Sequence, residues 1–169
     1  MKSSHYLFYG YANYQKILPR LQKDLAVLND PDYHYEIAIN EAVCNAARYA
    51  IAGINEVEIR IDVYLREHDI KTVVSAQTKL FNAQRYQDKL KKLAQDPTTR
   101  DLEWGDYTAD TERSRGFWFM LMSCNHLYMD SNGQRITLCA RTDFNPNQIV
   151  TKIHELVPKF LIEKEGVIL

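Results

Sequence analysis

The sequence has no excess of one charge, no long apolar run and no leader-like segment at its start, and each absence excludes a class of protein. Its 21 lysines and arginines balance 22 aspartates and glutamates, whereas a nucleic-acid binder usually carries a basic excess. The best apolar run, Gly116 to Met122, is far shorter than a membrane span. The first residues lack the continuous apolar core of a secretory signal. We therefore expect a soluble, cytoplasmic protein that binds neither nucleic acid nor membranes.

Cysteine is scarce, and the common motifs for metals and nucleophiles are missing. Cys44, Cys124 and Cys139 show no CxxC spacing, which argues against a disulfide framework or a zinc site. We expect them to be reduced, mostly buried thiols. The histidines do not stand at an HExxH spacing, so we expect no histidine-ligated metal. The sequence also contains no GxSxG elbow, no P-loop and no GxGxxG motif.

Length and composition fit one globular domain over residues 1–169. Of the 169 residues, 46% are hydrophobic and 25% are charged, which is enough apolar material to build a core. In several segments apolar residues recur every three or four positions, which is the pattern of an amphipathic helix. The expected helices are Tyr11–Leu28, Tyr33–Ala50, Arg85–Ala94, Gly116–Leu127 and Gln148–Glu163.

Alternation of apolar and polar residues predicts the strands, most clearly through Val57–Leu65. A tight turn then leads into the next strand, so this pair is expected to form an antiparallel hairpin. The expected strands are Tyr6–Tyr9, Val57–Leu65, Ile70–Ala76 and Arg135–Arg141. Helices grouped against such a sheet give an α+β fold, a two-layer sandwich. The long polar connection 82–113 is expected to be a lid, and 147–169 a C-terminal helical extension.

One helix face carries the most informative polar residues. Glu41 and Asn45 are four positions apart, so they share a face of the helix predicted at Tyr33–Ala50, and Arg48 follows one turn later. The rest of that helix is rich in alanine, isoleucine and valine. Spacing alone leaves two interpretations open, because a charged face often only meets solvent or pairs with a basic neighbour.

The surrounding segment YEIAINEAVCNAARYA resembles the N-box of the histidine-kinase-like ATPases, which have the Bergerat fold. It is most similar to the branch of anti-sigma-factor serine kinases. The resemblance implies a mixed, mostly antiparallel sheet with helices on one face. It also implies that Asn45 binds the magnesium ion on the ATP phosphates and that Arg48 belongs to the nucleotide site. Glu41 would be the catalytic base that orients or deprotonates a water or a substrate serine.

Two further segments resemble boxes of the same family. Ser114–Met122 is similar to its Gly-rich segment and helix, which implies that Arg115 and Gly116 lie at the phosphates. An isolated glycine is also typical of an ordinary helix start, so this alternative stays open. The family places Asp-x-Gly-x-Gly after the second hairpin strand to bind adenine. Here the aspartate position falls on Ser75, and the glycine positions fall on Gln77 and Lys79.

The resemblance leaves two classes of function open. The first is an ATP- and magnesium-dependent regulatory kinase that phosphorylates a serine of a partner protein, with lid cations closing on phosphate. The second is an interaction module of the same fold that has lost the nucleotide and regulates a partner by binding alone, with the lid a solvated loop. The candidate partners are a sigma factor, an anti-anti-sigma protein or a second copy of the chain in a homodimer.

Overall fold

The computed structural model describes residues 1–110, 114–143 and 145–164, and its centre is a six-stranded sheet with the order β1-β2-β3-β5-β4-β6. Every neighbouring pair is antiparallel except β4 and β6, which are parallel. The strands are β1 (Lys2–Tyr9), β2 (Glu58–Leu65), β3 (Asp69–Ala76), β4 (His126–Met129), β5 (Arg135–Arg141) and β6 (Phe160–Ile162). The predicted α+β class is thus confirmed, with a mixed and mostly antiparallel sheet.

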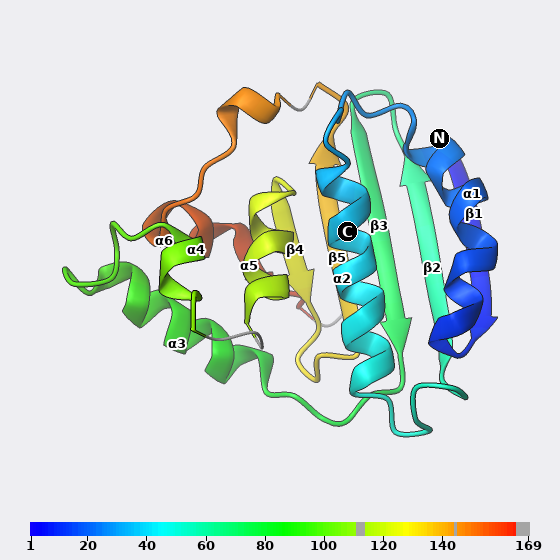
Figure 1. Ribbon diagram of the computed structural model, residues 1–169, viewed down its shortest axis with the longest axis horizontal. Coiled ribbons are helices and arrows are strands. Elements are labelled where there is room, and N and C mark those ends of the chain that lie inside the picture. Colours follow the sequence, from blue (N-terminus) through cyan, green and yellow to red (C-terminus); the bar gives the residue numbers. More distant parts are fainter. Residues whose placement is uncertain (111–113, 144, 165–169) are drawn as a thin grey trace.

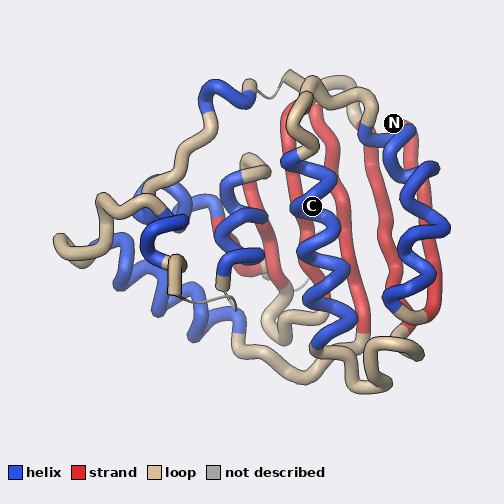
Figure 2. The backbone as a smooth tube through the Cα atoms, in the orientation of Figure 1, coloured by secondary structure: helices blue, strands red, loops and turns tan. Residues whose placement is uncertain are grey.

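Helices form a second layer on one face of this sheet (Figures 1 and 2). This layer consists of α1 (Tyr14–Leu25), α2 (His34–Arg48) and α5 (Arg115–Met122), whereas α3 (Ala83–Gln95), α4 (Trp104–Tyr107) and α6 (Ile153–Leu156) lie to the left of β4 in Figure 1. Short 3-10 turns occupy Tyr11–Asn13, Pro146–Gln148 and Val157–Lys159. Figure 1 shows α1, α2 and α5 in front of the strands, and α2 packs on β3 and against α5. Among the described helices, none has the length and apolar character needed to cross a lipid bilayer.

The alternation seen in the sequence explains how the sheet carries both layers. On β2, Ile59, Ile61 and Val63 are fully buried, whereas Glu58 and Arg60, on either side of Ile59, are exposed. Successive side chains of a strand point to opposite faces, so one face of β2 joins the core under the helices and the other meets solvent. A similar alternation occurs on β1 and β3, so the second face of the sheet carries mainly polar side chains.

The helix expected at Gly116–Leu127 is shorter than predicted. α5 ends at Met122, and the segment then pairs with β5 as the strand β4. The backbone N–H of Asn125 donates to the carbonyl of Cys139 at 2.8 Å, which starts this pairing. A short apolar run suits a buried helix and a buried strand equally well, so local sequence did not separate the two.

The single helix predicted at Gln148–Glu163 is wrong, and with it the expected helical extension over the described part of 147–169. The segment forms the short helix α6, a 3-10 turn that contains Pro158, and then β6. Proline cannot supply the N–H that a continuing helix needs. The residues after it pair with β4 instead, from Phe160 opposite Leu127 to Ile162 opposite Met129. Residues 165–169 lie outside the described residues.

The segment expected to be a lid contains two helices, and the first is anchored to the body of the domain. α3 includes the helix predicted at Arg85–Ala94, and it packs against α6 and β6. The side chain of Gln87 donates from Nε2 to the carbonyl of Phe160 at 2.9 Å. Asn82 caps α3 by accepting from the N–H of Arg85 at 2.9 Å. The last part of the expected lid, 111–113, lies outside the described residues.

Candidate functional site

The helix α2 positions the residues that the sequence singled out. Asp30 fixes its start, because its Oδ2 accepts the backbone N–H of Tyr35 at 2.7 Å. Burial of Ala38, Ile39, Ala42 and Val43 against the sheet then sets its rotation. In that orientation Glu41 and Asn45 lie half-buried along one side of α2, and Arg48 is exposed at its last turn.

Glu41 faces the first turn of α5, where Gly116 stands. A Cβ atom added at Gly116 would collide with Oε2 of Glu41, so the carboxylate occupies the space that a side chain would need. The two sequence boxes, 75 positions apart in the chain, thus meet at one place. Arg115 is the exposed residue directly before Gly116. A carboxylate, an amide and a helix start lie along the α2–α5 junction, which we call the α2–α5 site (Glu41, Asn45, Arg115 and Gly116).

The side chains of Glu41 and Asn45 make no hydrogen bond or ion pair to other described residues. Neither has a fully buried polar atom that lacks a partner, so both reach solvent. A half-buried carboxylate and amide without protein partners are available to bind a ligand. No cluster of three histidine, cysteine or acidic side chains that could hold a metal ion occurs in the described ranges. A magnesium ion at this site would therefore depend on phosphate and water for most of its ligands, which is usual for this ion.

The other side of α2 is engaged within the protein. Cys44 donates from Sγ to the hydroxyl of Tyr11 at 3.1 Å, and that hydroxyl lies 3.4 Å from Oδ1 of Asn40. The hydrogen bond with Cys44 and burial raise the pKa of Tyr11 to about 12, and the negative charge of Glu41 adds to the shift. Asn40 and Asn45 therefore differ, since the side chain of Asn40 has a hydrogen-bond partner and that of Asn45 has none among the described residues.

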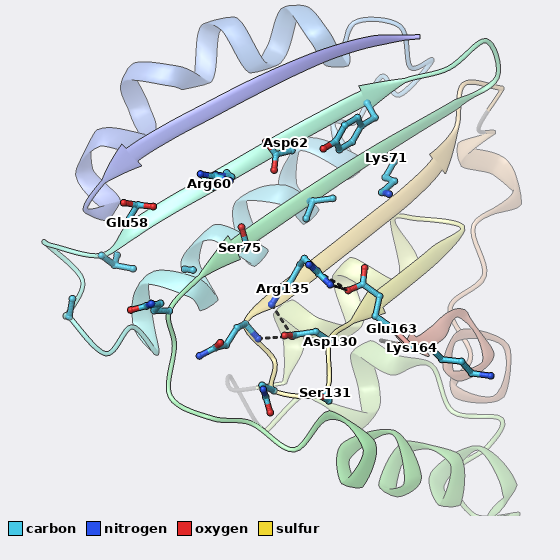
Figure 3. Close-up of a pocket in the computed structure, with 18 of the residues that line it drawn as sticks. Glu58, Arg60, Asp62, Lys71, Ser75, Asp130, Ser131, Arg135, Glu163 and Lys164 are labelled. Atoms are coloured by element: carbon cyan, nitrogen blue, oxygen red, sulfur yellow. Dashed lines mark hydrogen bonds and ion pairs between the residues drawn. The ribbon is translucent and has the colours of Figure 1, made fainter. Parts of the chain in front are cut away.

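The adenine-box residues do not join this site. On β3, Val74 is buried under the helices, and Ser75 points to the opposite face of the sheet (Figure 3). Gln77 and Lys79 flank Thr78, which is buried and paired with Ala50. Because neighbours in an extended segment point in opposite directions, both side chains turn outward, and both are exposed. The structure therefore separates Ser75 from Glu41 and Asn45 by the thickness of the sheet.

Ser75 instead lines an open groove of about 1080 Å³ on the face of the sheet without helices (Figure 3). It lies in one cross-strand row between Arg60 on β2 and Arg135 on β5. Glu163 holds Arg135 with an ion pair of 2.6 Å. Local sequence patterns do not predict this groove because its residues come from distant strands, although the polar positions of β2 indicate a solvent-facing side.

Most acidic groups of this groove are already bound by neighbouring side chains. Asp62 lies 2.7 Å from Nδ1 of His5, and Glu58 accepts from the hydroxyl of Tyr9 at 2.9 Å. Asp130 accepts the backbone N–H groups of Gln134 and Arg135. The groove is thus a polar sheet face with local pairing, as antiparallel sheets often present to water.

Cys124 and Cys139 do not offer reactive thiols. Cys124 is buried, and burial raises its pKa to about 12. Cys139 is half-buried, and burial raises its pKa to about 11. A thiol must be deprotonated to act as a nucleophile, so both are weak nucleophiles at neutral pH.

No protein-family model matches the chain, and no curated protein matches it significantly. Function is therefore inferred from the residues themselves and from where the fold places them.

Proposed function

We propose that the chain is an ATP-binding regulatory protein that resembles an anti-sigma-factor serine kinase and binds magnesium and ATP at the α2–α5 site. The single observation that supports this most strongly is the contact between Glu41 and Gly116. It unites the two segments that resemble phosphate and metal boxes, although nothing in the local sequence requires them to meet. The availability of the Glu41 and Asn45 side chains adds to the support.

Each residue of the site has a role that suits its chemistry. The amide oxygen of Asn45 would hold the magnesium ion, and the exposed guanidinium of Arg115 would bind phosphate oxygens. When bound, magnesium neutralises part of the phosphate charge. Glu41 would accept the proton of a serine hydroxyl from the partner protein as that oxygen bonds to the γ-phosphorus of ATP, while the bond from this phosphorus to the β–γ bridging oxygen breaks and ADP leaves. Gly116 leaves the space in which the carboxylate of Glu41 is held.

On this proposal, contacts to the phosphates of ATP, rather than contacts to its adenine base, provide most of the binding free energy. Ser75 lies on the far face of the sheet and has no carboxylate to accept the adenine amino group. Charge-assisted contacts to phosphate are stronger than neutral hydrogen bonds. We therefore expect ATP and other nucleoside triphosphates to bind with similar affinities.

The second candidate function, an interaction module without nucleotide, is favoured by one specific observation. The positions that would contact adenine are Ser75, Gln77 and Lys79, and their side chains point away from Glu41 and Asn45. A chain that only binds its partner would have no need of an adenine site. The α2–α5 contact would then serve packing alone.

Calorimetric titration of the full chain with ATP and magnesium tests the proposal. We expect saturable binding that requires magnesium, and an Asn45→Ala variant that binds at least ~10-fold more weakly. Asn40→Ala is the matched control, because this asparagine lies on the same helix but faces Tyr11. Its affinity should stay near that of the wild type. Absence of binding to ATP and ADP would contradict the proposal and favour the interaction module.

A further inference from the structure

The sheet has two edge strands, β1 and β6, which differ in length and in what covers their outer edges. β6 has three residues and lies against α3, whose Gln87 bonds to the carbonyl of Phe160 at 2.9 Å. β1 has eight residues without proline or glycine, in unbroken register with β2. Among the described residues no strand pairs with its outer edge. A long, regular and open edge is a template for a further strand.

The hydrogen-bonding pattern between β1 and β2 identifies which backbone N–H and C=O groups of β1 point away from β2. The N–H of Gly10 donates to the carbonyl of Val57 at 2.8 Å, in the register of the ladder. In an antiparallel pair, alternate residues point both N–H and C=O at the partner strand, and the residues between them point both away. The described residues make no hydrogen bond to the backbone groups that point to the open edge. These outward groups belong to Ser3, His5 and Leu7.

The side chains of β1 also divide into two sets. Tyr6 and Phe8 are buried toward the helix layer. Leu7 and Tyr9, on the other face, are 51% and 55% exposed. The carbonyl of Tyr9 already accepts a hydrogen bond from the side chain of Asn13, so the open stretch ends just before it. An added strand would cover apolar surface at the exposed end of β1.

Positive charge lies beside this edge on the helix-covered face. Asp24 on α1 binds Lys2 and Tyr6 of β1 at 3.0 and 2.6 Å, so this side of α1 faces the edge strand. The guanidinium of Arg20 lies over the Tyr6 ring, 5.9 Å from its centroid. Exposed cations one turn before and after it extend the charge along the helix. This α1 basic stripe consists of Lys16, Arg20 and Lys23, and it forms no ion pair with the described residues.

We propose that β1 is the docking site for an extended segment of another protein in which acidic and apolar side chains alternate. The segment would add to the sheet as a seventh strand through main-chain hydrogen bonds to Ser3, His5 and Leu7. Its side chains on the helix-covered face meet the α1 basic stripe, so carboxylates fit there. Its side chains on the opposite face meet Leu7 and Tyr9, so apolar groups fit there. The proposal is independent of nucleotide binding.

A second copy of the chain fits this edge less well. β1 contains no acidic residue, so it cannot supply carboxylates to the α1 basic stripe of another copy. Antiparallel pairing of two β1 strands around a twofold axis would also place both stripes on the same face. The repulsion between like charges disfavours that assembly.

The test uses a fluorescent peptide of about seven residues that alternates glutamate and valine, a length that suits one strand. The control peptide has lysine in place of glutamate. Binding to the full chain is followed by fluorescence anisotropy up to about 1 mM. We expect the glutamate peptide to bind, the lysine peptide not to bind, and the affinity to fall as salt is raised.

Two variants and one control variant locate the binding site of the peptide. Leu7→Pro removes an N–H that points to the open edge and leaves the bonds to β2 in place, and we expect at least ~10-fold weaker binding. Leu7→Val keeps that N–H and should bind like the wild type. Lys16→Glu combined with Lys23→Glu leaves β1 unchanged and should reverse the preference toward the lysine peptide.

Three results would overturn the proposal. One is absence of binding of the glutamate peptide over the whole range. Another is equal affinity for the wild type and for folded Leu7→Pro, with no effect of the lysine substitutions. The last is a wild-type dimer in sedimentation velocity that Leu7→Pro dissociates, because a second copy would then occupy the edge.

Discussion

Gly116 has no side chain, and this leaves room for the carboxylate of Glu41. Alanine at this position would push the carboxylate of Glu41 aside, and this carboxylate is the movable end of a flexible side chain. We therefore expect Gly116→Ala to keep the melting temperature or raise it slightly, since alanine favours a helix by up to about 1 kcal/mol over glycine. Binding of ATP and magnesium should nevertheless weaken several-fold.

Gly105→Ala is the control for this substitution. Nothing lies within 4 Å of a Cβ atom added at Gly105 on α4, so the change should leave nucleotide binding unaffected and alter stability only through the same helix preference of alanine. Thermal melting and calorimetric titration measure both effects. Unchanged nucleotide affinity in Gly116→Ala would contradict the role given to the Glu41–Gly116 contact.

Asp24 joins α1 to β1 and gives a prediction on pH. Burial alone would raise its pKa, but hydrogen bonds from Tyr6, Ser4 and Lys2 together lower it below the ordinary 3.8. A group with a lowered pKa in the folded state stabilises the fold above its unfolded pKa and loses this effect as the pH falls through the folded value. We expect Asp24→Asn to cost about 1–3 kcal/mol at neutral pH.

Urea unfolding of wild type and Asp24→Asn at neutral pH and at a series of acidic pH values below 3.8 measures this linkage. The difference between the two proteins should shrink in acid, because the wild-type carboxyl becomes protonated there. Tyr6→Phe, which removes one of the hydrogen bonds, should show a smaller loss of stability. A difference that is independent of pH would contradict the electrostatic origin of the effect.

At the residue scale, the sequence predicted which side chains share a helix face but not what lies opposite them. The spacing of Glu41 and Asn45 was sufficient to place them together on α2. That Gly116 meets Glu41 depends on how α5 packs, which local sequence does not determine. The alternation of β3 could have placed Ser75 away from the helices, because Val74 beside it is strongly apolar.

At the element scale, the predictions succeeded where a long pattern repeats. The alternation in β2 and the apolar stripe of α1 each extend over several repeats of their pattern, so both elements were recognised. β4 and β6 are short, and each becomes a strand only through its neighbours in the sheet. β1 begins at Lys2 rather than Tyr6, because pairing with β2 extends it through polar residues that carry no strand signal.

The edges of the sheet also belong to the element scale. Sequence reasoning did not order the strands, so it could not identify β1 as an edge. The contrast between a short edge covered by α3 and a long edge left open arises only from the assembled topology. The docking surface proposed for β1 follows from this contrast together with the α1 basic stripe.

At the scale of the whole molecule, grouping of helices against strands predicted an α+β fold with two layers. The polar groove on the free face of the sheet was not foreseen, since its residues converge from β2, β3, β5 and the segment after β6. The molecule therefore presents two polar sites on opposite faces. The central claim is that the nucleotide binds at the α2–α5 site and not in the groove.

Amide hydrogen exchange of the full chain, with and without ATP and magnesium, tests this claim most directly, because it reports protection at each backbone segment. The account predicts slower exchange in the second half of α2, from Glu41 to Arg48, and in the first turn of α5 around Gly116. Exchange along the groove, at Arg60, Ser75 and Arg135, should not change. Protection confined to the groove, or no protection in either region, would contradict the account.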